Sequence, residues 1–436
     1  MSAILSFIAE LLSTPAVILG LVAGVGLIAL RRSPSEVVTG VLKTMFGFLI
    51  LLAGASVIIS ALTPFGTMFA SAFGLEGIIA EDNSVVAAVQ SVLGRETALI
   101  LTFAFVVNVL IARLTPWKYI FLTGHMMFSF AGTMAIVLDQ MGMQGWPLIL
   151  VGSVIQGVSM VLFPAISQPV VRRVTGNDQI AFGFFGSSWI SLSGLVGGLF
   201  GNREQSTEEV KVPEGLDFLR DMGVLMALVL LPIFLATAIV SGPEQVAEAS
   251  SGATIIQFPQ NVVMFGIIQT LTFVAGILIL LQGVRMFLAE IIPAFRGVAE
   301  KIVPGARPAL DVPVFYSFAP VGVTIGFISA MVGGLLAAVI SRWLPVVILP
   351  SVIGLFFMGG AAGVFGNTYG GRRGAVAAGF FLGLTWSLLV ALAYPLVDLN
   401  EYGIQGLWFA TPDSILVVIV MKVIGTLFGV PWIPDS

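Results

Sequence analysis

The chain has 436 residues, of which 58% are hydrophobic and only 10% are charged, whereas a soluble globular protein carries roughly 25% charged residues. Its formal net charge of −4 comes without a basic tract, which argues against a nucleic-acid partner. With no cysteine and a single histidine, the sequence excludes thiolate metal sites and most protein-only catalytic sites. We therefore expect no catalytic residues, no metal and no cofactor.

Apolar runs long enough to cross a bilayer recur along the chain, and they predict an all-α polytopic membrane protein. About eleven crossings are expected near 15–30, 41–62, 97–112, 118–138, 146–166, 222–241, 261–282, 311–338, 344–366, 375–397 and 412–430. Two stretches, 63–96 and 285–310, mix apolar and charged residues at near-helical spacing. We expect these two stretches to form amphipathic helices on the membrane surface.

The apolar run 180–200 is interrupted by glycines, so it is predicted to be a re-entrant or interfacial segment that lines a cavity. Basic residues gather in alternate loops, and this alternation holds only if 180–200 crosses an even number of times. Because basic loops face the cytoplasm, the N-terminus is expected outside and the C-terminus inside. The charged loop 202–221 is then cytoplasmic, and it is too short to form a soluble domain.

The sequence repeats itself at an offset of 229 residues. The matching positions are 47–54 (GFLILLAG) with 276–283 (GILILLQG), Pro64 with Pro293, and Asp82 with Asp311. We therefore interpret 1–436 as one permease domain with inverted repeats, about 15–166 and 222–397, and one extra helix at 412–430. Carriers that work by alternating access bind their substrate between such halves. Gly54 and Gly283 are predicted to be packing glycines, since small residues let membrane helices approach closely.

Ionisable groups inside a membrane are costly, so each is a candidate for function. His125 lies in an apolar crossing and can donate to an anionic or hydroxyl-rich ligand, although a buried histidine bonded to a backbone carbonyl is the alternative. The preceding Gly124 lets a ligand approach the backbone. Asp311 opens the eighth crossing, where its carboxylate either binds ligand hydroxyls or caps the helix. Asp82 is its repeat partner, with simple N-capping as the favoured role.

Four blocks of sequence resemble the ascorbate-specific IIC permease family of the bacterial phosphotransferase system. They are TGHMMF (123–128), QGVRMFLAE (282–290), PGARPALDVPVFYSFAP (304–320) and GVFGNTYGGRRGA (363–375). The resemblance implies an elevator-type sugar permease of the bacterial cytoplasmic membrane that forms a homodimer. It also implies soluble IIA and IIB partners, which relay a phosphoryl group to the sugar at the cytoplasmic face.

The resemblance also implies a substrate site. The family's membrane-embedded histidine and aspartate match His125 and Asp311. Substrate-site positions implied nearby are Thr123, Gly124, Ser129, Gly183 and Phe184. The chain departs from the family at Phe184, Phe185 and Ser129, where ascorbate-handling members carry histidine and glutamine.

Three hypotheses follow from the sequence. The leading one is a sugar permease of the phosphotransferase system, most consistent with L-ascorbate or a related sugar or polyol as substrate. A less polar substrate stacked on Phe184 and Phe185 is the variant that the aromatic replacements favour. The second hypothesis is a carrier of the same fold that is driven by an ion gradient. The third is a membrane sensor or assembly partner that transports nothing.

Overall fold

The computed structural model describes residues 15–72, 77–80, 82–209, 221–251, 258–301, 303–404 and 406–427. The helices are α2 Pro15–Ala29, α3 Pro34–Ala72, α4 Asp82–Leu114, α5 Gly124–Gln140, α6 Gly145–Thr175, α7 Ser187–Gly197, α8 Met222–Ser251, α9 Val262–Lys301, α10 Val312–Tyr316, α11 Pro320–Ile340, α12 Val352–Gly354, α13 Gly360–Ala393 and α14 Pro412–Leu427. The strands are β1 Ile78–Ala80, β2 Tyr119–Phe121, β3 Ala181–Phe182, β4 Arg307–Leu310, β5 Ile348–Leu349 and β6 Leu407–Trp408.

Within the described residues, seven helical stretches are long and apolar enough to span a membrane. This agrees with the predicted helical, polytopic membrane protein, while the number of eleven crossings stays a prediction. One of these stretches, Val352–Leu396, reverses its direction at Gly371, where φ is +58°. A Cβ atom added to Gly366 would lie 2.5 Å from the Cβ of Ala378. Such closeness is only reached when the two legs of α13 run antiparallel to each other.

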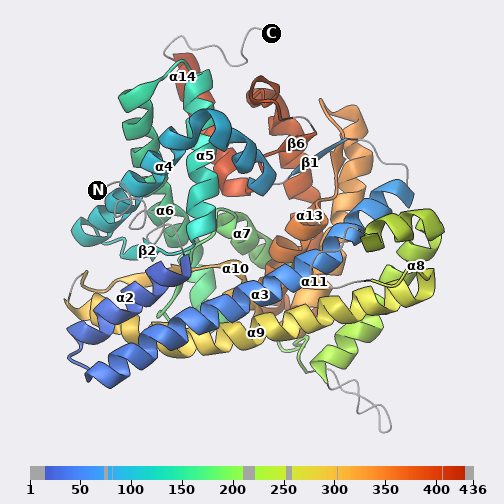
Figure 1. The fold of residues 1–436 in the computed structure, drawn as a ribbon, viewed down its shortest axis with the longest axis horizontal. Helices are drawn as coiled ribbons and strands as arrows, with labels where there is room; N and C mark the ends of the chain where they lie inside the picture. Colours follow the sequence, from blue (N-terminus) through green and yellow to red (C-terminus); the bar gives the residue numbers. More distant parts are fainter. Residues whose placement is uncertain are drawn as a thin grey trace.

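The helices α3 and α9 are the longest in the chain, with 39 and 40 residues. They run side by side across the lower half of the molecule (Figure 1). Residues 63–72 continue α3, and residues 285–301 continue α9, so the structure differs here from the expected separate surface helices. Pro64 and Pro293 lie inside the two helices without ending them. A proline removes one backbone hydrogen bond, and packing on neighbouring helices can outweigh that loss.

The repeated glycine segments form the contact between α3 and α9, as predicted. A Cβ atom on Gly54 would overlap the backbone of Leu280, and one on Gly283 would overlap the backbone of Leu51. Adding 229 to Gly54 gives Gly283, and subtracting 229 from Leu280 gives Leu51, so the repeat offset converts one pair into the other. Gly47 meets Phe287 in the same contact, so the two helices are antiparallel. Glycine is needed here because the two backbones touch.

Among the described residues, six short parallel strands, which the sequence did not predict, form two small sheets. The order is β5-β1-β6 in one sheet and β2-β4-β3 in the other. Both sheets follow one plan, in which a central strand from one part of the chain lies between two strands from the other part. The offset of 229 relates Ile78 of β1 to Arg307 of β4, and Tyr119 of β2 to Ile348 of β5.

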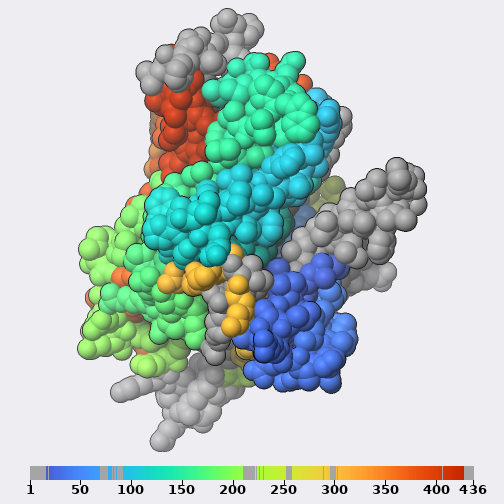
Figure 2. All heavy atoms as spheres, turned by 90° about the vertical axis from the view of Figure 1, so that its left-hand side faces the viewer, coloured from blue at the N-terminus to red at the C-terminus, as the bar shows by residue number. Residues whose placement is uncertain are grey.

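The helices form two groups. The first consists of α2, α3, α8 and α9, which pack on one another, and the second contains α4 to α7 and α10 to α14. Few elements join the groups: α10 and β4 touch α9, α12 touches α3, and α11 touches α8. The ring of Phe273 in α9 also packs on Phe327 of α11 and on Phe356. In the space-filling view, the blue N-terminal helices lie below the cyan α4, with orange residues from around position 300 between them (Figure 2).

The segment 180–200 forms β3 and the short helix α7. Before it, the guanidinium of Arg173 lies 4.5 Å from the ring centroid of Tyr369. Near the end of the segment, a Cβ atom on Gly198 would lie 3.2 Å from the Cβ of the same Tyr369. The chain before the segment and the last residues of the segment therefore approach the same residue, while its middle reaches the pocket described below. The helix α14, expected as an additional element, follows β6 as α7 follows β3.

Candidate functional site

A cavity of about 250 Å³ lies where the carboxyl ends of the two sheets face each other. Each of the six strands contributes at least one lining residue at or just after its carboxyl end. In strand order these are Ala80 and Asp82, His125 and Met126, Phe184, Asp311, Ser351, and Ala410 and Thr411. The helix α3 closes one wall with Leu51, Leu52, Ala55 and Ile59. The cavity thus lies between the two groups of helices and draws on both parts of the chain.

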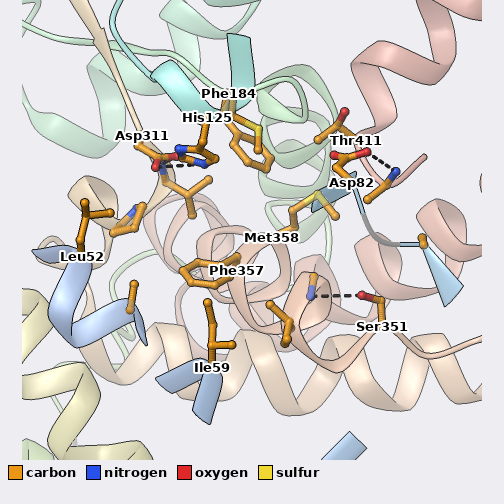
Figure 3. A pocket seen from close by; sticks show the side chains of 18 of the residues that line it. Leu52, Ile59, Asp82, His125, Phe184, Asp311, Ser351, Phe357, Met358 and Thr411 are labelled. Atoms are coloured by element: carbon orange, nitrogen blue, oxygen red, sulfur yellow. Dashed lines mark hydrogen bonds and ion pairs between the residues drawn. The ribbon is translucent and has the colours of Figure 1, made fainter. Parts of the chain in front are cut away.

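His125 and Asp311 meet at one end of this pocket (Figure 3). Strands β2 and β4 are parallel neighbours, with Phe121 opposite Ala309, and this pairing brings the residues that follow them together. The His125 Nε2 atom lies 3.6 Å from the Asp311 Oδ2 atom. The histidine side chain is 47% exposed and the aspartate side chain 19%, so both can still reach a ligand.

The two carboxylate oxygens of Asp311 make different contacts. Its Oδ1 atom accepts a hydrogen bond of 2.7 Å from the backbone N–H of Val312, which caps α10. Its Oδ2 atom faces His125. The two roles weighed from the sequence, capping and ligand contact, are therefore compatible in one residue. A cap also fixes the orientation of the carboxylate, which leaves one oxygen directed at the pocket.

Asp82 and Thr411 lie at the opposite side of the pocket from that pair (Figure 3). Asp82 begins α4, and its Oδ1 atom accepts a hydrogen bond of 2.8 Å from the backbone N–H of Ala410. This bond joins the chain after β1 to the chain after β6. Asp82 therefore stabilises the wall of the pocket that it lines.

Three further predicted residues lie close to the pocket but are not among its lining. Thr123 is buried, and its hydroxyl has no hydrogen-bond partner among the described residues. Gly124 begins α5 beside His125. Ser129 is buried one turn further along α5. Of the four substrate-site residues predicted in the block 123–129, His125 therefore lines the pocket and the other three do not.

The glycine and phenylalanines after β3 divide between packing and the pocket. Gly183 is a close-approach glycine, since a Cβ atom there would overlap the carbonyl of Ala309. Phe184 lines the pocket. Phe185 does not, because its ring is 1% exposed and stacks at 4.9 Å on Phe121 and at 4.2 Å on Phe130. The expectation that a substrate could stack on both phenylalanines is corrected to Phe184 alone.

Ser351 is a lining residue that the sequence reasoning missed. It precedes α12, and its hydroxyl accepts a hydrogen bond of 3.3 Å from the backbone N–H of Gly354. Subtracting the repeat offset from Ser351 gives Leu122, next to Thr123 in the TGH block. The repeat itself was therefore the signal that could have found it. Phe357 and Met358, which form the floor of the pocket, carried no such signal.

A charged cluster lies at the amino ends of β3 and β4. The Oδ1 atom of Asp178 accepts a hydrogen bond of 2.7 Å from Nε of Arg172, and its Oδ2 atom binds the guanidinium of Arg307, the first residue of β4. Burial alone would raise the pKa of Asp178. Hydrogen bonds from Arg172 and Gln168, together with the charge of Arg307, outweigh burial and lower that pKa below its usual value.

Comparison with known proteins agrees with this architecture. The family model described as the PTS system sugar-specific permease component (EIIC-GAT), where PTS denotes the phosphotransferase system, matches residues 10–413. The chain is also 27% identical over 457 residues to the ascorbate-specific PTS system EIIC component of Mycoplasma pneumoniae. That alignment covers 92% of this chain and 68% of the relative. The family suggested by the sequence blocks is thus confirmed, and the chain belongs to the sugar-specific permease components of the phosphotransferase system.

Proposed function

We propose that this permease component binds L-ascorbate between His125 and Asp311 and carries it across the cytoplasmic membrane of a bacterium. The observation that carries the proposal is the imidazole and carboxylate pair, 3.6 Å apart, at the end of a cavity enclosed by both parts of the chain. Intramembrane ionisable pairs that face a cavity mark substrate pathways. The ascorbate-specific name of the relative from Mycoplasma pneumoniae adds support.

The chemistry of the pocket suits a small ring with several hydroxyl groups. The imidazole of His125 can donate to an anionic enediol, and the free oxygen of Asp311 can accept from a hydroxyl. The cavity of about 250 Å³ is close to the lower end of ligand pockets, roughly 300–1,000 Å³, and fits one sugar-sized molecule. Phe184 offers an apolar face beside the pair.

The proposal includes an architecture and a movement. We infer two inverted repeats, with the N-terminus outside, the C-terminus in the cytoplasm, and two copies of the chain in a dimer. The antiparallel contact of α3 with α9, whose residue pairs exchange at the offset of 229, supports the inversion. We further infer that α2, α3, α8 and α9 stay fixed while the pocket-bearing helices slide along them. The small number of elements that join the two groups supports this elevator movement.

We infer that partner proteins, and not this chain, phosphorylate the sugar. The chain contains no cysteine and one histidine, which is placed in the pocket. We infer that a soluble IIA protein and a soluble IIB protein relay the phosphoryl group, and that the IIB protein transfers it to the sugar at the cytoplasmic face. This chain then binds and moves the substrate without carrying a phosphoryl group itself.

One observation favours an ion-driven carrier of the same fold as the second candidate. The position of Phe184 is aromatic, and Phe185 is stacked into the core, so neither supplies a hydrogen bond to a polyhydroxylated ring. Each ligand hydroxyl left without a partner costs roughly 1–3 kcal/mol of affinity. A less polar solute, with fewer hydroxyl groups, would lose less here than ascorbate.

The test combines binding with transport. The purified full-length protein is titrated with L-ascorbate, with a linear polyol and with a hexose, and then reconstituted in vesicles with and without IIA, IIB and a phosphoryl donor. The proposal predicts ascorbate binding to the permease alone and accumulation of phosphorylated ascorbate only with the partners. Uptake of an unmodified solute that needs an ion gradient and no phosphoryl donor would establish the ion-driven carrier instead, and the absence of ascorbate binding would contradict the proposal.

A further inference from the structure

The floor of the pocket is built on an unusual turn. Residues Leu355–Gly359, between α12 and α13, form a single π-helical turn. Two of them, Phe357 and Met358, line the pocket. A π-turn holds one residue more than an α-turn, so it rotates the chain before it by roughly 100° relative to a continuous α-helix. The positions that match this turn at the repeat offset lie in α5, which is a regular α-helix there. The turn is therefore a feature of one half only.

Tyr316 holds the carbonyl groups of this turn. Its hydroxyl donates to the carbonyl oxygen of Phe357 at 2.8 Å and lies 3.4 Å from that of Phe356. The side chain of Tyr316 is fully buried, and a buried tyrosine hydroxyl requires a partner. Tyr316 is also the last residue of α10, the five-residue helix that Asp311 caps. One short helix thus connects the acidic group of the pocket to its floor.

Neighbouring residues of the turn face opposite ways. Phe356 is fully buried and packs on Phe273, with ring centroids 5.1 Å apart, and on Phe327 at 5.6 Å. Phe357 faces the pocket instead. A change from π to α geometry shifts the register of the chain before the turn by one residue relative to α13. Phe357 would then take the buried place of Phe356, and Phe356 would take the equally buried place of Leu355.

The far side of the turn cannot rotate. Gly359 and Gly363, at the start of α13, lie directly against the backbone of Gly326 in α11. A Cβ atom added to Gly326 would overlap the carbonyl oxygen of Gly359 and the Cα atom of Gly363. Such backbone contact fixes the start of α13 in register with α11. Relaxation of the turn must therefore move α12 and the residues up to Phe357.

We propose that Tyr316 is a positioning residue, whose hydroxyl keeps the π-turn open so that Phe357 forms the floor of the substrate pocket instead of packing into the core. The inference rests on the proposed function only for the identity of the molecule that meets this floor. Tyr316 itself does not line the pocket and so does not touch the substrate. It acts through the backbone carbonyls that it binds, and it thereby sets which aromatic face the substrate meets.

The test uses the chain's lack of cysteine. Single cysteines are placed at 357 (Phe357→Cys) and at 356 (Phe356→Cys), and their rates of reaction with a small water-soluble thiol reagent are measured on purified full-length protein. In the otherwise unchanged protein, the cysteine at 357 should react faster than the one at 356, because reactivity follows exposure. Adding Tyr316→Phe, which removes one hydroxyl, should slow the reaction at 357 towards the rate at 356, which should stay low because position 356 remains buried.

Tyr402→Phe is the matched control. It removes a hydroxyl whose hydrogen bond, to Asp139, is also 2.8 Å long, and it lies outside the pocket lining. It should leave both rates unchanged. An unchanged rate at 357 with Tyr316→Phe would overturn the proposal. If Phe356→Cys fails to fold, the rate at 357 alone decides, since Tyr316→Phe should slow it and Tyr402→Phe should not. No substrate is used, so failure here is separate from failure of the proposed function.

Discussion

At the scale of single residues, the site depends on two side chains that the chain brings together from 186 positions apart, His125 and Asp311. The sequence identified both because ionisable groups are rare in apolar crossings. It could not show that they meet, because the meeting depends on two strands of three and four residues. Strands so short, inside apolar runs, carry no periodic signal of their own.

Removing either group should remove binding. We predict that His125→Ala and Asp311→Ala each weaken substrate affinity by about 1.5–3 kcal/mol, or roughly 10- to 150-fold, because each deletes a charge-assisted hydrogen bond. Both variants should still insert in the membrane and elute as monodisperse protein. Calorimetric titration measures the affinity. The control is Glu36→Gln, which alters an exposed carboxylate at the start of α3, and wild-type affinity in both pocket variants would remove the site assignment.

The pH dependence of Asp178 is a second prediction at this scale. Since its pKa is lowered in the folded protein, its ion pairs stabilise the fold above its ordinary pKa, and this stabilisation is lost as the pH falls through the lowered value. Asp178→Asn should therefore lower the free energy of unfolding at pH 7 by about 1 kcal/mol or less, because the group is partly exposed and screened. The difference from wild type should shrink near pH 3. A difference of equal size at both pH values would contradict this account.

At the scale of elements, the crossing of α3 and α9 depends on glycine. We predict that Gly54→Ala and Gly283→Ala each cost about 1–3 kcal/mol through crowding, since the backbone of the partner helix leaves no space for a methyl group. Leucine at either place should lower the folded yield further. Gly66→Ala, on the same helix, is the control, because its Cβ atom would meet Val352 at an ordinary 3.5 Å. Thermal unfolding in detergent measures all of these, and equal stability of Gly54→Ala and Gly66→Ala would count against the crossing.

The sequence predicted some elements for good physical reasons and missed others. The glycine segments were identified because close helix packing selects small residues. The continuation of α3 beyond Pro64 was missed, because proline usually ends or kinks a helix and only tertiary packing shows that it does not here. Phe184 and Phe185 looked equivalent in sequence, and only the stacking of Phe185 between Phe121 and Phe130 separates them.

At the scale of the whole molecule, two groups of helices meet around the pocket, and the proposed elevator movement requires one group to slide past the other. Gly66 of α3 and Val352 of α12 lie on opposite sides of this boundary, and a Cβ atom on Gly66 would be 3.8 Å from that of Val352. This separation lies within the range of a disulfide, roughly 3.5–4.5 Å. The natural chain has no cysteine to interfere.

We therefore predict that the double variant Gly66→Cys with Val352→Cys loses transport when oxidised and regains it when reduced. Substrate binding should persist in the oxidised form, because neither residue lines the pocket. The two single-cysteine variants serve as controls and should transport in both conditions. Full transport by the oxidised double variant, with the disulfide verified by mass spectrometry, would rule out the sliding movement.

Strand ends from both parts of the chain enclose one cavity, and we propose that this cavity is the substrate site, with His125 and Asp311 at its end. A structure of the full-length protein, in lipid and with L-ascorbate added, tests this site assignment. We expect ligand density in the cavity, within hydrogen-bond distance of the imidazole of His125 and of the Oδ2 atom of Asp311. Ligand density elsewhere in the protein, with these two groups free of it, would show that the site assignment is wrong.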